Sequence, residues 1–313
     1  MMMPAEAIME YPAYLHAASA GALAAKAEAA REVLRACRLC PRACRADRFA
    51  GPRRGYCQIG RLAHVASWGP HHGEEACLSG RRGSGTIFFS RCNLGCVFCQ
   101  NSDISQASPG NEVEAEALAA IMLDLQDRGC HNINLVTPSH VVPQIIEAVG
   151  IAAAKGLRLP LVYNTGGYDS LASLALLDGL VDIYMPDFKA WNPNLANRLL
   201  SARNYPGAAR RAIREMHRQV GPLEVDRDGI ARRGVLVRHL VMPGLIEDSR
   251  AIFEFLARDV SPDTYVNILA QYHPAHRSSL YPAVDRPVLM GEVQAARDAA
   301  AAAGLHRFDG AAF

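Results

Sequence analysis

Three cysteines in one short loop have the residue type and spacing for metal chemistry. Cys92, Cys96 and Cys99 follow the pattern C-x3-C-x2-C and come directly after residues 86–89, an apolar run rich in β-forming residues. Three thiolates that converge from one loop suit a 4Fe–4S cluster in which one iron has no protein ligand. An open coordination position is where a small molecule binds. The spacing therefore predicts a cluster that binds a ligand.

A second group of cysteines lies nearer the N-terminus. It consists of four residues within about twenty positions that are also rich in turn-forming proline and glycine: Cys37, Cys40, Cys44 and Cys57. Four protein ligands can hold either one zinc ion or a second iron–sulfur cluster, and the sequence leaves both open. So short a segment has little apolar surface, and we therefore expect metal binding to supply its folding energy.

The elements that position these cysteines follow from hydrophobic periodicity. Apolar runs predict strands at 86–89, 132–137, 159–164, 181–188, 235–242 and 265–272. Helical patterns predict helices at 17–36, 113–128, 141–155, 171–177, 194–219, 249–258 and 291–303. Six βα units imply an α/β fold, a partial parallel (β/α)6 barrel. We expect this barrel at 81–313, preceded by a small Cys-rich metal-binding extension at 1–80.

Polar residues lie at or just beyond the ends of the predicted strands. They are Ser90, Thr137, His140, Asn164, Thr165, Asp187, Lys189, Arg238, His239, Gln271 and His273. In parallel barrels, chemistry takes place at the carboxyl ends of the strands, so a ring of polar side chains there favours a polar ligand. The segment 68–77, which contains Glu74 and Glu75, is expected to be a polar loop with solvated charges.

The loop Cys92-Asn-Leu-Gly-Cys96-Val-Phe-Cys99 resembles the cluster loop of the radical S-adenosylmethionine (SAM) enzymes, down to the aromatic residue before the third cysteine. The resemblance implies that the open iron holds SAM and that one electron from the cluster breaks its C5′–S bond. The resulting 5′-deoxyadenosyl radical abstracts a hydrogen atom from the substrate. It also implies an electron donor such as flavodoxin or ferredoxin. On this basis the cofactor contacts are Asn101, Thr137, Asn164, Asp187, Lys189 and His239.

The ending Cys99-Gln-Asn101 is similar to that of the glycyl-radical-enzyme activating group, in which the asparagine lies near SAM. Several segments extend this resemblance to the pyruvate formate-lyase activating-enzyme-like branch: Cys40-Pro-Arg, His72-Gly-Glu-Glu75, Val136-Thr-Pro-Ser-His140, Tyr163-Asn-Thr-Gly-Gly-Tyr168, Pro186-Asp-Phe-Lys189 and Gln271-Tyr-His-Pro274. One departure concerns the Gly-Gly-Glu type motif of true activating enzymes, where this chain has Thr137-Pro-Ser-His140. The hydroxyls of Thr137 and Ser139 can still accept hydrogen bonds. We therefore expect SAM binding to persist and the substrate to differ.

Composition narrows the class of protein. The 33 basic and 31 acidic residues nearly cancel, so bulk charge gives no reason to expect a nucleic acid or a membrane as partner. No apolar run reaches membrane-spanning length, and the first residues lack the pattern of a secretory signal. We therefore expect a cytoplasmic protein whose nine cysteines are reduced and available for metal.

Together these features predict a radical SAM enzyme of the glycyl-radical-activating-like kind, with SAM, an electron donor and a candidate protein substrate as partners. Two alternatives stay open. The first is a radical SAM enzyme that acts on a small metabolite. The second is a non-catalytic iron–sulfur or zinc protein, a redox relay or scaffold. A fourth cluster ligand supplied by Cys77 or His72 would favour the second alternative, because electron-carrying clusters normally have all four ligands.

Overall fold

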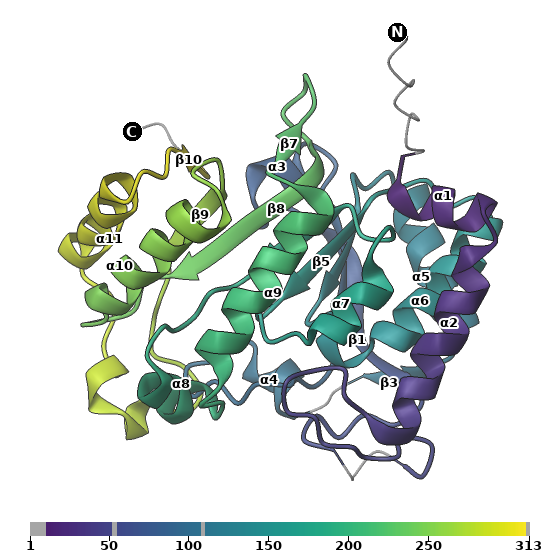
Figure 1. The fold of residues 1–313 in the computed structure, drawn as a ribbon, viewed down its shortest axis with the longest axis horizontal. Helices are drawn as coiled ribbons and strands as arrows, with labels where there is room; N and C mark the ends of the chain where they lie inside the picture. Colours follow the sequence, from purple (N-terminus) through teal and green to yellow (C-terminus); the bar gives the residue numbers. More distant parts are fainter. Residues whose placement is uncertain (1–10, 52–54, 108–109, 311–313) are drawn as a thin grey trace, which may run out of the picture.

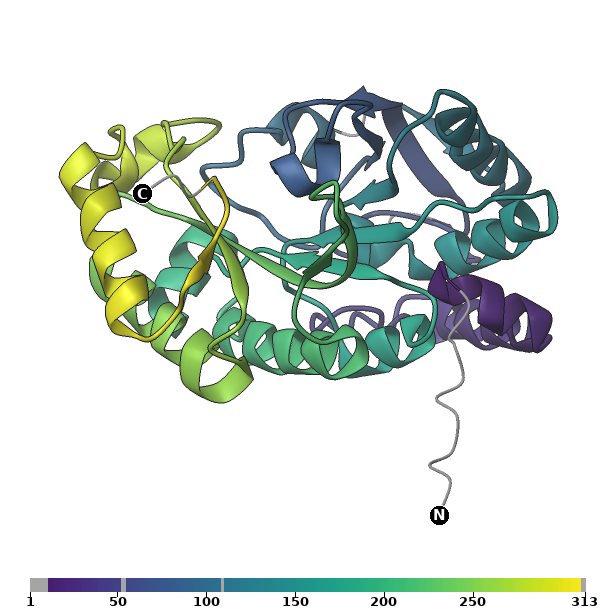
Figure 2. The ribbon, with the colours of Figure 1, turned by 90° about the horizontal axis from the view of Figure 1, so that it is seen from above.

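A computed structural model describes residues 11–51, 55–107 and 110–310 of the chain, and one curved sheet organises it (Figures 1 and 2). The strand order is β10-β9-β8-β6-β5-β4-β2-β1-β3. Six neighbouring strands are parallel: β2 (Ser84–Phe89), β4 (Ile133–Val136), β5 (Leu161–Thr165), β6 (Ile183–Pro186), β8 (Ala231–Leu240) and β9 (Tyr265–Leu269). The partial parallel (β/α)6 barrel is therefore confirmed, as is the small Cys-rich N-terminal extension.

Four strands were not predicted. They are β1 (Ala63–His71), β3 (Asn111–Val113), β7 (Glu224–Val225) and β10 (Arg307–Phe308). The first of these pairs antiparallel with β2 and includes residues 68–71 of the segment 68–77, so our expectation of a loop was wrong for these residues. The expectation of solvated charges was also wrong, because Glu75 is buried and the side chain of Glu74 is only 9% exposed.

Helices connect the parallel strands and cover the outer side of the sheet (Figure 2). They are α5 (Ala115–Asp127), α6 (Val142–Ala154), α7 (Leu171–Leu177), α8 (Pro193–Leu200), α9 (Tyr205–Val220), α10 (Ile246–Phe255) and α11 (Met290–Ala302). The helix predicted at 194–219 is thus two helices. The chain breaks at Ser201, whose φ of +55° is left-handed, and a new helix begins at Tyr205 with Pro206 in its first turn, where a missing N–H costs no helical hydrogen bond. No helix in the described ranges is both long and apolar enough to span a bilayer.

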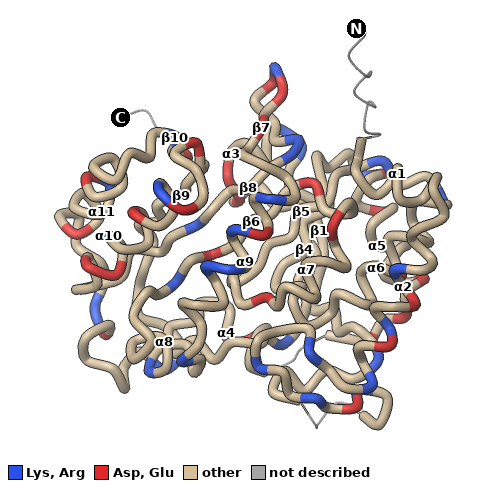
Figure 3. The backbone as a smooth tube through the Cα atoms, viewed as in Figure 1, with Lys and Arg blue, Asp and Glu red and all other residues tan. Residues whose placement is uncertain are grey.

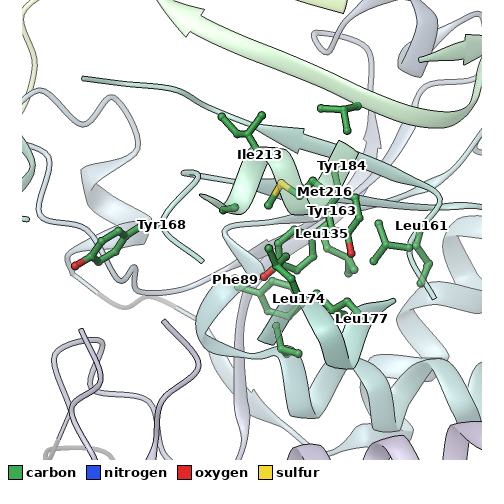
Figure 4. Close-up of a cluster of buried hydrophobic side chains, with 14 of the residues drawn as sticks. Phe89, Leu135, Leu161, Tyr163, Tyr168, Leu174, Leu177, Tyr184, Ile213 and Met216 are labelled. Carbon is green, nitrogen blue, oxygen red and sulfur yellow. The ribbon is translucent and has the colours of Figure 1, made fainter. Parts of the chain in front are cut away.

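The two faces of the sheet have different cores, because side chains alternate along each strand. On the outer face, Phe89, Tyr163 and Tyr184 pack with residues of α7 and α9 (Figure 4). On the inner face a smaller apolar cluster closes one end of the barrel: Cys77 and Leu78 of α3 (Ala76–Ser79) with Val162, Ile183, Met185 and Leu236. Nearer the carboxyl ends of the same strands, the inner face is polar.

The N-terminal extension is packed against the barrel. Helices α1 (Ala13–Ser19) and α2 (Ala22–Glu32) lie on α6, and Tyr14, Leu34 and Leu39 join the outer core. The Ala13 N–H also donates to Asp182 at 2.8 Å. Residues 1–10 and 52–54 of this part lie outside the described residues. The division of the chain at residue 80 stays a prediction, and β1 from the first part pairs with β2 from the second.

The turn after β5 gives a test of close packing beside the strand ends. Gly167 and Gly179 have φ of +73° and +77°, so alanine at either position has a similar backbone cost of roughly 1 kcal/mol. A Cβ at Gly167 would also overlap the Asp187 carbonyl oxygen, whereas nothing lies within 4 Å of one at Gly179. We expect Gly167→Ala to lower the urea unfolding free energy by about 1–3 kcal/mol more than Gly179→Ala does. Equal losses would contradict this close approach.

Candidate active site

The loop that carries Cys92, Cys96 and Cys99 leaves the carboxyl end of β2 and is fixed by its neighbours. The backbone N–H groups of Gly95 and Val97 donate to carbonyls at the end of α8, at 3.0 and 2.9 Å. In Figure 1 this end of the barrel faces downward, beside α4 (Ser102–Ser105) and α8. The loop is therefore held to the barrel by backbone hydrogen bonds before any metal binds.

The three thiols suit a cluster. Cys96 is buried, and desolvation raises the pKa of its thiol and raises that of Cys92 to about 11. The ammonium of Lys189 opposes both increases in pKa. Its side chain lies beside the cluster loop, because Lys189 Cε and a methyl group of Leu94 both lie within 4 Å of the position of a Cβ on Gly166. The Leu94 N–H donates to Cys92 Sγ at 3.3 Å, and Ser105 Oγ lies 3.2 Å from Cys99 Sγ. Such thiols keep their protons until a metal replaces them, and three thiols can hold three of four irons.

Beside the thiols, charged and polar side chains form one network on the inner face. Asp187 accepts from Lys189 Nζ at 2.5 Å and from Arg238 Nε at 2.8 Å. Arg238 Nη2 also donates to Asn164 Oδ1 at 2.7 Å. Although burial opposes its ionisation, the two cations hold the pKa of Asp187 below its usual value. Three of the predicted cofactor contacts, Asn164, Asp187 and Lys189, are thus brought together, and Arg238 joins them.

Two carboxylates reach this network from the opposite end of the barrel, and sequence reasoning missed them. Glu74 Oε2 lies 3.5 Å from Arg238 Nη1, and Glu75 Oε1 accepts from Asn267 at 2.8 Å. Desolvation raises the pKa of Glu74 to about 7; Arg238 lowers it and Glu75 raises it further. The motif His72-Gly-Glu-Glu75 was the available signal, but its burial depends on α3 closing the barrel.

Some inner polar atoms have no hydrogen-bond partner in the described part of the chain. Both amide atoms of Asn134 are buried in this state, and so is Glu75 Oε2 while Glu74 is ionised, because a protonated Glu74 hydrogen-bonds to Glu75. Asn134 is in register with Val162, whose side chain belongs to the inner cluster, so it shares that face. Buried polar atoms are almost always paired, so these atoms indicate room for a polar ligand or water.

The other predicted cofactor contacts are not part of the network. Both ring nitrogens of His239 are engaged away from it, with Phe188 O and Ser249 Oγ at 2.8 Å each. Asn101 is exposed at the start of α4. Thr137 begins the turn after β4 with φ of +60°, and its N–H donates to Asn164 O at 2.8 Å. The structure therefore places Thr137 next to the network, and His239 outside it.

The four N-terminal cysteines line one cavity of about 20 Å³. The side chains around it are those of Cys37, Cys40, Cys44, Cys57, Arg42, Arg48, Asn93 and His140, among others. Among the described residues, no three Cys, His, Asp or Glu side chains are grouped closely enough to bind a single ion. Asn93 belongs to the cluster loop, so the cavity adjoins that loop.

The residues named as candidate fourth ligands lie elsewhere. Cys77 packs in the apolar cluster at the amino end of β2, whereas the cluster loop follows the carboxyl end of the same strand. His72 lies at that amino end too, beside Gly83. The strand separates both residues from Cys92.

Comparison with known proteins identifies the family. The radical SAM superfamily domain matches residues 86–256, more than half of the chain. The chain belongs to the radical SAM superfamily. A 4Fe–4S cluster and SAM are therefore cofactors of this radical SAM protein, and the cysteine triad fits the cluster. An uncharacterized protein of Methanocaldococcus jannaschii is 29% identical over 283 residues, which cover 88% of this chain and 77% of the relative.

Among solved structures, the radical SAM protein is similar to SuiB of Streptococcus suis. The crystal structure of SuiB bound to S-adenosylmethionine is 12% identical, with a TM-score of 0.46, and the match covers 68% of this chain and 47% of that one. The crystal structure of SuiB bound to precursor peptide SuiA is 11% identical, with a TM-score of 0.45, and the match covers 66% of this chain and 42% of that one. The chain spans less than half the length of these proteins, and at these values no substrate or residue role transfers.

We predict that changing Cys92, Cys96 or Cys99 to alanine prevents assembly of the catalytic cluster, because each thiolate holds one iron. Anaerobic reconstitution should then leave the characteristic absorption of that cluster missing and 5′-deoxyadenosine formation at background. Cys77→Ala is the matched control, since its thiol lies at the other end of the barrel. Loss of the cluster in Cys77→Ala would instead support a four-ligand carrier.

The raised pKa of Glu74 predicts a pH effect on stability. The folded protein holds this proton more tightly than the unfolded chain, whose value is near 4.5. Stabilisation is therefore fully present below pH 4.5 and is lost as pH rises through about 7. Between pH 5 and 8 the wild type should lose roughly 1–3 kcal/mol of unfolding free energy relative to Glu74→Gln. As a control, the exposed Glu116→Gln should have the same pH dependence of the unfolding free energy as the wild type. If the difference in unfolding free energy between wild type and Glu74→Gln did not change with pH, Glu74 would be ionised throughout this range.

Proposed function

We propose that this radical SAM protein abstracts a hydrogen atom from a small polar substrate bound on the inner face of the barrel beside Arg238. One observation carries the proposal: a part-buried ionic network joins the cluster end of the barrel to Glu74 and ends in unpartnered polar atoms. When bound, SAM supplies a 5′-deoxyadenosyl radical through one-electron cleavage of its C5′–S bond. The cluster thiols and this network determine where that radical meets a substrate.

The network divides into two parts. Lys189 lies beside the cluster loop and donates to Asp187, so we assign both, with Asn164 and Thr137, to the cofactor. Glu75 and Asn134 lie deeper and hold the unpartnered atoms, so we assign them to the substrate. Two of these three atoms are acceptors, which favours a substrate with amine or hydroxyl groups. Arg238 connects the two parts and is a positioning residue.

Activation of a glycyl-radical enzyme is the second candidate function. The ending Cys99-Gln-Asn101 supports it, and a protein would then be the substrate. Thr137-Pro-Ser-His140 in place of a Gly-Gly-Glu type motif counts against it. Either function needs a one-electron donor of the flavodoxin or ferredoxin class, and the cytoplasmic location stays a prediction.

The small-substrate proposal is tested by measuring the transfer of deuterium from a labelled substrate to 5′-deoxyadenosine. We expect anaerobically reconstituted protein, given SAM, dithionite and a mixture of deuterated amino acids and polyols, to form 5′-deoxyadenosine that carries deuterium, measured by mass spectrometry. Glu75→Gln should reduce the amount of deuterium transferred at least about tenfold, because it replaces one acceptor oxygen at the substrate with an NH2 group. The exposed Glu116→Gln should keep it.

The second candidate has its own readout in the same preparation. Incubation with a glycyl-radical enzyme and SAM, followed by electron paramagnetic resonance, detects a glycyl radical as a doublet. A doublet without deuterium transfer from any small molecule would overturn the small-substrate proposal and establish the activating function. Absence of 5′-deoxyadenosine under every condition would overturn both.

A further inference from the structure

We propose that Cys37, Cys40, Cys44 and Cys57 hold a second iron–sulfur cluster, packed against the loop of the first. The sequence left zinc and iron equally open at this site. The site is independent of the substrate proposed above, and only its role rests on SAM cleavage at the first cluster.

Two buried side chains in the cavity have polar atoms without partners, and a sulfur-rich centre would supply an acceptor to one of them, Arg48. Arg48 and His140 are each 2% exposed and line the same cavity as the four thiols. Arg48 donates from Nε to the Ile59 and Gly60 carbonyls and from Nη1 to the His140 carbonyl, which leaves Nη2 unpartnered within the described residues. A guanidinium N–H without an acceptor is costly to bury.

The ring of His140 has the opposite requirement. Its Nε2 lies 3.0 Å from the Ser90 carbonyl oxygen, which can only accept, so Nε2 carries the hydrogen. The buried Nδ1 therefore has a bare lone pair and no partner in the described part of the chain. With four cysteine ligands no iron of the cluster is open to this lone pair, but sulfide or thiolate sulfur can accept from Arg48 Nη2.

The charge around the cavity suits an anionic centre. The described part of the segment 37–60 contains one acidic residue, Asp47, and four arginines: Arg38, Arg42, Arg45 and Arg48. Figure 3 shows the charged residues along the chain. Four thiolates outweigh the positive charge of a cluster core or of a zinc ion, so either centre would be negative. Charge thus supports a centre here, and position decides between the metals.

The position is against the cluster loop. Arg42 Nε donates to the Asn93 carbonyl at 2.6 Å, and its guanidinium stacks on Tyr56 at 3.3 Å from the ring centroid. Asn93 follows Cys92 directly and also lines the four-cysteine cavity. Gly95 packs so tightly on Tyr56 that a Cβ there would overlap the hydroxyl. One peptide segment therefore separates the two groups of thiols.

This position gives the second cluster a role that zinc cannot have, because zinc has no redox chemistry. SAM cleavage consumes one electron per turnover. A reduced carrier protein of the flavodoxin or ferredoxin class would lose one electron, and the second cluster would pass it to the first. The carrier is oxidised, the sulfonium is reduced, and no other reactant is needed.

The decisive experiment uses the full chain with Cys92, Cys96 and Cys99 all changed to alanine. After anaerobic reconstitution with iron and sulfide in the presence of zinc, we expect about four irons per chain and a cluster signal in electron paramagnetic resonance after reduction. About one zinc per chain would overturn the proposal. The proposal would also be overturned if the folded protein bound neither metal and all four thiols could be alkylated. The cavity would then hold only water.

A second variant tests the contact with Arg48. In the same triple-alanine background, Arg48→Gln should lower the midpoint potential of the second cluster, because it removes a buried positive charge. Arg45→Gln removes an exposed charge from the same segment and should leave the potential unchanged. Equal potentials in both would overturn the assignment of Arg48 to this centre.

The two proposals fail separately. Wild-type protein that forms 5′-deoxyadenosine with dithionite, while the triple variant binds no iron, refutes only the second cluster. A triple variant with four irons, beside a wild type that never cleaves SAM, refutes only the proposed reaction.

Discussion

The ion pairs that Asp187 forms with Lys189 and Arg238 are the constraint on which the site depends, and each of the three side chains is only 18% exposed. Each charge alone would be costly inside the barrel, and removing one partner of a buried ion pair leaves the other uncompensated. Asp187 accepts from both cations, at 2.5 and 2.8 Å, and Asp187 and Arg238 also form a bridge between β6 and β8. The ion pairs therefore align these strand ends and fix the polar face beside the cluster thiols.

The same network gives the barrel two unlike ends. At the amino ends of the strands, α3 closes the inner face with Cys77 and Leu78 against apolar residues. Toward the carboxyl ends the inner face becomes polar, and Glu74 extends from the closing segment to Arg238. An apolar cluster at the amino ends and polar side chains toward the carboxyl ends leave the cluster end of the barrel as the chemically active one, as is usual for parallel barrels.

The N-terminal extension forms part of the wall of the site. Ser170 caps α7 and also donates to the carbonyls of Arg38 and Leu39, while Arg42 holds the cluster loop through Asn93. The loop is thus held by α8 from one side and by the Cys-rich segment from the other.

The sequence alone determined the features that depend on local order. Periodicity located the six parallel strands and most helices within a few residues, and the spacing of Cys92, Cys96 and Cys99 predicted the radical SAM superfamily, which the domain match at residues 86–256 confirms. Tertiary structure decided what depends on long-range packing. It showed that β1 pairs with β2, that Glu74 and Glu75 are buried beside Arg238, and that His239 binds Phe188 and Ser249 instead of the network. Local patterns report which face of one element is apolar, but they do not report which distant residue meets that face.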